Sequence, residues 1–261
     1  WSVTSPQDTF RELCHLRSTL EAFAATRLPE HPQRAQILAR LKKHLAALKT
    51  CARKGDYEAF HQADMALHRE LIASADVPTL ADSWLATTRA LDADILAVKK
   101  DHWPSLMALH REHELLVEAW SSSDLSGIEQ ATHHHLEVGW YRRALAAGRL
   151  PEAGEAVDRV ASFLSAHYAS AIDLEWVAAN VAFMSSRHLA RLFKARFGDA
   201  PYAWLRRHRL ERAAQLLTTT DRDIADIGRA VGYVNASHFA RDFHGHTRKT
   251  PKAFRTFAKA G

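Results

Sequence analysis

The stretch 181-VAFMSSRHLARLF-193 recurs fifty residues later in the chain as 231-VGYVNASHFARDF-243. Val, an aromatic residue, His, Ala, Arg and Phe repeat in register between the two stretches. A proline follows each closing phenylalanine after eight residues, at Pro201 and at Pro251. A match of this length is improbable by chance, so the C-terminal part of the chain holds two copies of one structural unit.

Each copy has the pattern of a short helix, a tight turn and a second helix. Apolar residues three and four apart mark the first helix, and they are Leu174, Val177, Ala178 and Val181 in one copy and Ile224, Ile227 and Val231 in the other. A side chain that can cap a helix N-terminus precedes the second helix, Ser185 or Ser186 in one copy and Asn235 in the other. The repeat therefore predicts two helix-turn-helix units.

The second helix of each unit is predicted to bury its phenylalanines and to present a polar face. In the first unit this face carries Arg187, Arg191 and Lys194, and in the second it carries Ser237, Arg241 and His244. An arginine in the N-terminal half of such a helix suits the major groove of DNA, where a guanidinium group can bind guanine O6 and N7. The pattern predicts two DNA-reading helices.

A helix over about residues 200 to 220 is predicted to join the two units. Its roughly 20 residues span about 30 Å, close to the 34 Å of one turn of the DNA duplex. Two recognition helices held apart by this rod can enter successive major grooves on one face of the duplex. We expect arginines on the rod to meet the intervening phosphates, and they are Arg206, Arg207, Arg209 and Arg212.

The charge of the chain is unevenly distributed. Residues 151 to 261 carry 17 Lys and Arg against 11 Asp and Glu, whereas residues 1 to 150 carry 18 against 19. A basic domain beside a nearly neutral one is typical of a module that binds a polyanion, because phosphate neutralisation drives most nucleic-acid affinity. A basic face that is merely solvated is the alternative explanation of the charge alone.

Residues 7 to 148 have a helical pattern almost throughout, with apolar residues three and four apart and no alternating strand pattern. Turn-forming residues interrupt this pattern at 29-PEHP-32, 55-GD-56, 76-DVP-78, 101-DHWP-104 and 121-SSSDLSG-127. We therefore expect an all-α protein with an antiparallel bundle of about six helices over residues 1 to 148. A linker is expected over residues 149 to 156, followed by the double helix-turn-helix domain over residues 157 to 261.

Cys14 and Cys51 match no metal or redox spacing and are too few for a disulfide framework. No run of about 18 apolar residues is present, and the first 20 residues lack the basic start and the apolar middle of a signal peptide. We expect a soluble cytoplasmic protein that keeps its cysteines reduced.

Four residues of the N-terminal region have the spacing of a metal site. Asp64 and His68 lie one helical turn apart and share a helix face. His113 and His135 each lie eleven residues from Asp124, at the break between two helices. Positions equidistant from the turn of a helix hairpin lie side by side. Three imidazoles and a carboxylate suit Zn, Ni, Mn or Fe. Because the chain has 17 histidines, a solvated tract at 133-HHH-135 is the alternative.

The segment from about 157 to 257 resembles the DNA-binding domain of the AraC/XylS family. The resemblance rests on 191-RLFKARFGDAPYAWLRRHRLERAAQLL-217 and 224-IADIGRAVGYVNASHFARDFHGHTRKTPKAFR-255. It implies base-reading positions at Arg187 and Arg191 in the first unit and at Ala236, Ser237 and Arg241 in the second. Ala236 departs from the family pattern, because members often carry a longer polar side chain there. The resemblance thus implies that the second unit makes fewer direct contacts with the bases.

Residues about 9 to 146 resemble the FCD ligand-binding domain of many GntR-family regulators. The matching stretches are 13-LCHLRSTLEAFAATRL-28, 55-GDYEAFHQADMALHREL-71 and 113-HELLVEAWSSSDLSGIEQATHHHLE-137. The resemblance implies a metal site at Asp64, His68, His113 and His135, and it leaves His110, His133 and His134 outside the pattern. It also implies that Arg17 binds an acidic effector, with a solvent-exposed salt bridge as the alternative role. GntR regulators carry a winged helix before this domain, whereas here a double helix-turn-helix domain follows it.

Together these observations predict a transcription regulator rather than an enzyme. We expect a homodimer that binds a double-stranded DNA operator, a divalent metal ion and a small organic acid effector, with zinc favoured and Ni, Mn or Fe as alternatives. Two other functions stay open. The bundle could be a metal-dependent enzyme, because a site with open coordination positions can activate water. The ion itself could also be the signal.

Overall fold

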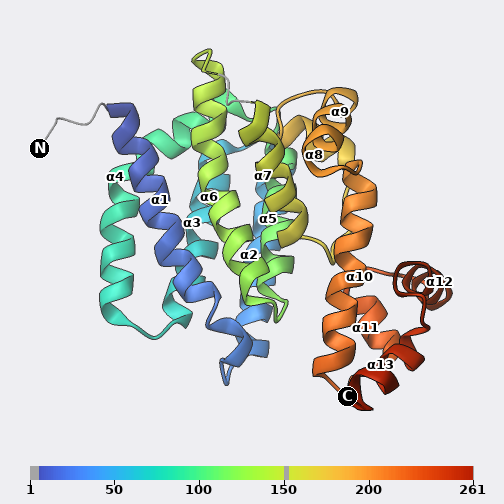
Figure 1. Ribbon diagram of the computed structural model, residues 1–261. Helices are drawn as coiled ribbons and strands as arrows, with labels where there is room; N and C mark the ends of the chain where they lie inside the picture. The colour runs from blue at the N-terminus through green and yellow to red at the C-terminus, as the bar shows by residue number, and fades with distance from the viewer. Residues whose placement is uncertain (1–5, 150–152, 261) are drawn as a thin grey trace, which may run out of the picture. The chain divides into compact units, whose positions relative to one another are not determined.

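A computed structural model describes residues 6–149 and 153–260 of the chain (Figure 1). Within these ranges the regular structure is entirely helical, which confirms the predicted all-α class. The chain divides into two compact units, Trp1–Pro151 and Glu152–Gly261. Of the expected linker, residues 150–152 lie outside the described ranges, whereas residues 153–156 already belong to the first helix of the second unit.

The first unit is the expected bundle, coloured from blue to light green in Figure 1. Its described residues form six α-helices and one short 3₁₀-helix, which are α1 (Pro6–Ala25), η1 (Leu28–Glu30), α2 (Arg34–Lys54), α3 (Tyr57–Ser74), α4 (Pro78–His102), α5 (Leu106–Trp120) and α6 (Leu125–Ala146). Helix α1 packs against α6, α4 and α3, while α2 packs against α3 and α5. This packing brings α1, α3, α5 and α6 around one interior region.

The helix boundaries of the bundle follow from the local sequence. Gly55 ends α2 in the left-handed conformation, with φ of 69°, which glycine adopts at little cost. Asp56 then caps α3, because its side chain accepts a hydrogen bond from the backbone N–H of Ala59 at 2.9 Å. Ser105 caps α5 in the same way. These short-range interactions explain why the breaks were visible in the sequence.

The core of the bundle is built from the apolar stripes of its helices. Trp84 of α4 and Trp120 of α5 are among the largest buried side chains, and they pack with leucines from α2 and α3, among them Leu41, Leu48, Leu67 and Leu71. Buried side chains of this size contribute roughly 1.5–3 kcal/mol each to folding. This apolar core can therefore offset the cost of the buried charges described below.

The second unit contains the repeat. Its helices are α7 (Ala153–Ala166), α8 (Leu174–Asn180), α9 (Ser186–Phe197), α10 (Pro201–Thr219), α11 (Ile224–Ala230), α12 (Ala236–Thr247) and α13 (Pro251–Ala260). Helices α8 and α9 form one helix-turn-helix, α11 and α12 form the other, and α10 joins them. Ser185 caps α9 and Asn235 caps α12 through their side-chain oxygens, as the sequence predicted. Figure 1 shows the second pair of helices beside the lower part of α10.

The turn of the second helix-turn-helix depends on Gly232. Its φ of 87° lies in the left-handed region. A Cβ atom at this position would lie 2.9 Å from the carbonyl oxygen of Ala169 and 3.0 Å from that of Tyr168. Only glycine therefore allows the turn to pack closely against the segment between α7 and α8.

No helix in the described part of the chain combines the length and the apolar character that a membrane span requires.

Candidate metal centre and nucleic-acid interface

The four residues predicted to bind a metal lie together in the interior of the bundle. Helix α3 supplies Asp64 and His68, α5 supplies His113 and α6 supplies His135. One potential ligand atom from each residue lies within 4.8 Å of the other three. The helical spacing of α3 places Asp64 and His68 on one face, and the hairpin of α5 and α6 places His113 and His135 at one height, which together account for this convergence.

The side chains are arranged around Asp64. Its Oδ1 atom lies in short contact with Nε2 of His113 and 3.3 Å from Nε2 of His68. The rings of His113 and His135 meet edge to face, with centroids 4.3 Å apart. Nε2 of His68 and Nδ1 of His135 are buried without a hydrogen-bond partner. Buried nitrogen atoms are normally paired, so these two unpaired nitrogen atoms are candidates for metal ligation.

Hydrogen bonds behind the cluster orient two of its rings. Nδ1 of His113 donates to the carbonyl oxygen of Leu109 at 2.8 Å, and this leaves the lone pair of Nε2 directed into the cluster. Nδ1 of His68 is bonded to Glu21 Oε2 at 2.5 Å, which directs its Nε2 the same way. Metal-binding histidines usually have such partners on their second nitrogen, because these fix the tautomer and the ring orientation.

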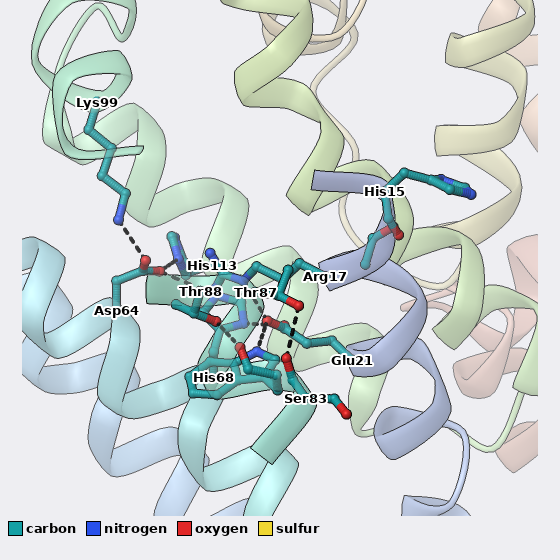
Figure 2. A network of polar contacts seen from close by, with 12 residues as sticks. His15, Arg17, Glu21, Asp64, His68, Ser83, Thr87, Thr88, Lys99 and His113 are labelled. Atoms are coloured by element: carbon teal, nitrogen blue, oxygen red, sulfur yellow. Dashed lines mark hydrogen bonds and ion pairs between the residues drawn. The ribbon is translucent and has the colours of Figure 1, made fainter. Parts of the chain in front are cut away.

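Glu21 of α1 was not identified from the sequence. Besides His68, it accepts hydrogen bonds from Nε of Arg17 and from Nε1 of Trp84, both at 2.8 Å. Figure 2 shows Glu21 beside Arg17 and His68. The carboxylate is completely buried. The one available signal was its position four residues after Arg17, on the same face of α1.

Lys99 of α4 is a second residue that the sequence analysis missed. Its side chain extends to Asp64 in Figure 2, and its Nζ donates to Asp64 Oδ2 at 2.6 Å. Nζ also lies 3.0 Å from Nδ1 of His61. Lys99 is only 4% exposed. Lysine near the C-terminus of a helix is usually a solvated residue that favours the helix dipole, so the sequence contained no signal of this role.

The electrostatics of the cluster favour ionised carboxylates. Burial alone would raise the pKa of Asp64, but the charges of Lys99, His113 and His68 hold it well below its ordinary value. Burial likewise opposes the charge of Glu21, yet the charges of His68 and Arg17 lower its pKa to about 2. The cluster therefore keeps two negative groups in the interior, balanced by cations.

The pKa values of two histidines in the cluster, His68 and His135, are shifted in opposite directions. Burial lowers the pKa of His68, but the neighbouring Glu21 and Asp64 carboxylates outweigh burial and raise it. Burial lowers the pKa of His135 well below its ordinary value, and the charges of His113 and His68 lower it further. His135 is therefore neutral at pH 7, which is the form that binds a metal ion.

Arg17 is buried, with 3% of its surface exposed, so the alternative of a solvent-exposed salt bridge is wrong. Its Nε atom is bonded to Glu21, whereas its Nη2 atom has no hydrogen-bond partner. Arg17 lines a cavity of about 50 Å³ together with Lys99 and the four clustered residues. A guanidinium and an ammonium group thus face the same small space.

The other histidines singled out from the sequence lie outside the cluster. His110 is buried elsewhere on α5. His133 and His134 precede His135 on α6 but supply no atom to the cluster. His133 instead lies against α1, with Nδ1 2.8 Å from the Ser18 hydroxyl.

All six residues predicted to contact DNA are exposed. Arg187, Arg191 and Lys194 lie on α9, while Ala236, Ser237 and Arg241 lie on α12. On the same helices Leu189, Phe193, Phe239 and Phe243 are buried, whereas Phe197 at the end of α9 is half-buried. The periodicity of 3.6 residues per turn therefore separates a core face from a polar face on both helices.

The four arginines of α10 that were expected to meet phosphates have different surroundings. Arg206 is exposed, but Arg207 pairs with Asp199. Arg209 donates from Nε to the carbonyl oxygen of Tyr168 at 2.6 Å and from Nη2 to that of Ser170 at 2.8 Å. The prediction that Arg209 meets phosphates is wrong, because its guanidinium group donates to carbonyl groups of the segment between α7 and α8. Arg212 donates to Gln215 of its own helix.

Comparisons with known proteins support both domains. A family model described as FCD domain matches residues 12–138, and one described as helix-turn-helix domain matches residues 178–256. The regulatory protein PocR of Salmonella typhimurium is 34% identical over 93 residues, which cover 36% of this chain and 30% of that protein. The arabinose operon regulatory protein of Escherichia coli is 34% identical over 106 residues, which cover 40% of this chain and 36% of that protein.

A solved transcriptional regulator from Chromobacterium violaceum, described as having an AraC-type DNA-binding domain, is 30% identical. The match covers 40% of this chain and 93% of that chain, with a TM-score of 0.38. The chain spans about a third of the length of the two curated relatives. The chain thus joins an FCD domain to a helix-turn-helix domain of the AraC type.

Proposed function

We propose that this protein is a transcription regulator that binds an operator through its C-terminal unit and binds a divalent metal ion and a small carboxylate through its N-terminal bundle. The observation that carries the sensing part is the convergence of Asp64, His68, His113 and His135, with two buried nitrogen atoms left unpaired. The DNA-binding part rests on the two exposed helix faces and on the family match of residues 178–256.

The donor set fits a transition metal. Imidazole nitrogen and carboxylate oxygen are ligands of Zn, and Ni, Mn and Fe accept the same combination. Asp64, His68, His113 and His135 would hold the ion, which would supply a Lewis-acidic centre for an anion. Lys99 holds Asp64 Oδ2, so Oδ1 is the oxygen that faces the imidazoles. We favour zinc.

An acidic ligand fits the cationic groups beside the cluster. The unpaired Nη2 of Arg17 faces neither a protein acceptor nor bulk solvent, and the adjoining cavity is small. A carboxylate bound there would receive a charge-assisted hydrogen bond from the guanidinium group, which offsets the loss of its hydration. The volume of about 50 Å³ favours a short organic acid over a bulky one.

Base reading is assigned to α9 and α12. Arg187 and Arg191 belong to α9, and Ser237 and Arg241 belong to α12. Helix α10 has 19 residues and is therefore about 28 Å long, slightly less than one turn of the duplex. Two grooves on one face of the DNA would then be read together. Ala236 offers only a methyl group, which limits its contact to apolar surface such as that of thymine.

Metal binding by site variants tests the buried site. His113→Ala and His135→Ala should each abolish binding of the tightly held ion, whereas His134→Ala, a neighbour on α6, should retain it. The measurement is the metal content of the full chain after dialysis against a weak chelator. Retention of the tight ion at full stoichiometry in both variants would refute the site.

The role of the ion is tested separately from its presence. Operator affinity is measured by fluorescence anisotropy with and without chelator, at a fixed concentration of each organic acid in a panel. An organic acid that changes operator affinity in the wild type, but not without metal and not in Arg17→Ala, supports the proposed pairing of ion and carboxylate. A response of operator affinity to the metal alone would instead identify the ion as the signal. The small cavity is the observation that favours this second function, a metal-responsive regulator.

A further inference from the structure

A second group of potential ligands lies on the outer side of α1 and α6. It consists of His15, His133 and Glu137, and one potential ligand atom from each residue lies within 4.8 Å of the others. Glu137 Oε1 lies 2.9 Å from Nδ1 of His15 and 3.8 Å from Nδ1 of His133. The two imidazole rings stack, with centroids 5.8 Å apart and an interplanar angle of 26°.

These distances are suited to a metal ion. Zinc bonds of about 2.0–2.1 Å in a tetrahedron place neighbouring ligand atoms roughly 3.3 Å apart. The two observed separations, 2.9 and 3.8 Å, lie on either side of this value. His133 and Glu137 are one helical turn apart on α6, so they present their donor atoms from one face. A small adjustment of the exposed His15 side chain, which is 68% exposed, would complete a three-ligand set.

The outer group is separate from the buried cluster. His133 and Glu137 each lie two residues from His135, and positions two apart on a helix point in widely different directions. The same spacing separates His15 from Arg17 on α1. In Figure 2 His15 points away from the network that contains Arg17, Glu21 and Asp64. The side chains of Glu137 and His133 are 29% and 28% exposed, so water can occupy further coordination positions.

We propose that His15, His133 and Glu137 bind a second divalent transition-metal ion, which links α1 to α6 at the surface of the bundle. Nitrogen and carboxylate ligands at an exposed site suit Zn, Ni, Co or Cu(II). This site is weaker than the buried one, because it offers three protein ligands rather than four.

Ser18 weakens the site further. Its hydroxyl group donates to the carbonyl oxygen of His15 at 2.8 Å and can therefore only accept from Nδ1 of His133, also at 2.8 Å. Metal binding through this nitrogen must break that hydrogen bond and release its proton. Removal of the hydroxyl group should therefore strengthen metal binding.

The experiment measures zinc and nickel binding to the full chain, freed of any affinity tag, by equilibrium dialysis at constant pH. We expect two ions per chain at tens of micromolar free metal. His15→Ala and Glu137→Gln should each bind one ion and keep the tighter one, with a loss of at least tenfold in the affinity of the weaker site. Both residues are exposed or half-buried, so these variants should fold.

Matched variants separate the two sites. His134→Ala should keep both ions, and Ser18→Ala should bind the weaker one several-fold more tightly. In a His113→Ala background the weaker ion should remain, and adding His15→Ala should remove it. The inference would be overturned if both His15→Ala and Glu137→Gln still bound two ions. It would also be overturned if the wild type bound a single ion and both variants bound it equally well. A single ion that is lost in His15→Ala but kept in His113→Ala would support this inference and contradict the buried site.

Discussion

Glu21 connects three elements of the bundle through one carboxylate. It lies on α1, receives hydrogen bonds from Arg17 of the same helix and Trp84 of α4, and pairs with His68 of α3. A buried charge is tolerated only when its partners compensate for the lost hydration. The pKa of about 2 shows that these partners outweigh burial.

The low pKa of Glu21 leads to a prediction for Glu21→Gln. A carboxyl whose pKa is depressed by folding stabilises the protein above its unfolded pKa, and this stabilisation disappears as the pH falls toward the folded pKa. The shift from 4.5 to about 2 corresponds to about 3 kcal/mol at pH 7. In urea unfolding with chelator present, Glu21→Gln should lose about this amount at pH 7. The difference from wild type should shrink steadily below pH 4.5.

The exposed Glu12 on the same helix provides the control. Glu12→Gln should leave the free energy of unfolding within about 0.5 kcal/mol of wild type. An equal loss for Glu21→Gln at pH 7 and at pH 3 would mean that the carboxylate acts through shape rather than through its charge.

Metal binding should depend on pH through the histidine ligands themselves. A ligand imidazole must lose its proton before it binds zinc. Glu21 and Asp64 raise the pKa of His68 above its ordinary value of 6.5, so the affinity for zinc should already begin to fall above about pH 6.5 and fall further as the pH drops. Isothermal titrations between pH 5.5 and 8 in buffers with different ionisation enthalpies would also measure the number of protons released. An affinity that is constant across this range would argue against histidine ligation.

At the scale of the element, α9 and α12 each have one buried apolar face and one exposed polar face. Each buries two aromatic or aliphatic side chains and exposes an arginine at the equivalent position, Arg191 on α9 and Arg241 on α12. The surroundings of the two arginines differ, because Nε of Arg241 lies 3.7 Å from Oδ1 of Asp242. The two helices are therefore expected to contribute unequally to sequence recognition.

Arg191→Ala and Arg241→Ala should each cost about 1 to 3 kcal/mol of specific binding and relax the preference at one base pair. Lys194→Ala should weaken binding to operator and to random DNA alike and should reduce the slope of affinity against salt. Competition titrations with operator and random duplexes at several salt concentrations measure both effects. Equal losses on the two DNAs for the arginine variants would identify them as phosphate contacts.

Two glycines of the second helix-turn-helix should respond oppositely to alanine. Gly232→Ala places a Cβ against backbone carbonyl groups at a φ of 87°, so it should cost more than about 1 kcal/mol. Gly245 lies within α12 with no atom within 4 Å of a Cβ, so Gly245→Ala should stabilise the helix by about 0.5–1 kcal/mol. Thermal unfolding of the C-terminal unit within the full chain tests the pair. The same sign for both variants would contradict the proposed role of the turn.

At the scale of the whole molecule, we expect a homodimer formed through the N-terminal bundle. Leu16 and Phe23 of α1 are 47% and 48% exposed and lie seven residues apart, on one face of the helix. Apolar residues grouped on a surface favour a protein interface. The double variant Leu16→Glu with Phe23→Glu should sediment as a monomer at tens of micromolar, whereas Leu125→Glu, which alters an equally exposed leucine on α6, should not change the association state. A wild-type chain that sediments as a monomer would refute the expectation.

Much of this architecture could be predicted from the sequence because local rules determine it. The six helices of the bundle, the caps at Ser185 and Asn235 and the exposed faces of α9 and α12 all follow from periodicity and capping within one or two turns. The proximity of His113 and His135 also had a local cause, since a hairpin relates positions on either side of one turn. The assignment of the metal ligands as a set needed the family resemblance as well.

Only the tertiary structure decided which charged residues are buried together. Glu21 and Lys99 reach the cluster from α1 and α4, and no short-range pattern relates these positions to Asp64. Arg209 has the sequence context of a phosphate-binding residue, yet it bonds to carbonyl groups near the end of α7. His15, His133 and Glu137 meet because α1 packs along α6. Periodicity specifies the face on which a residue lies, but the partner of that face depends on the packing of distant helices, which sequence spacing does not encode.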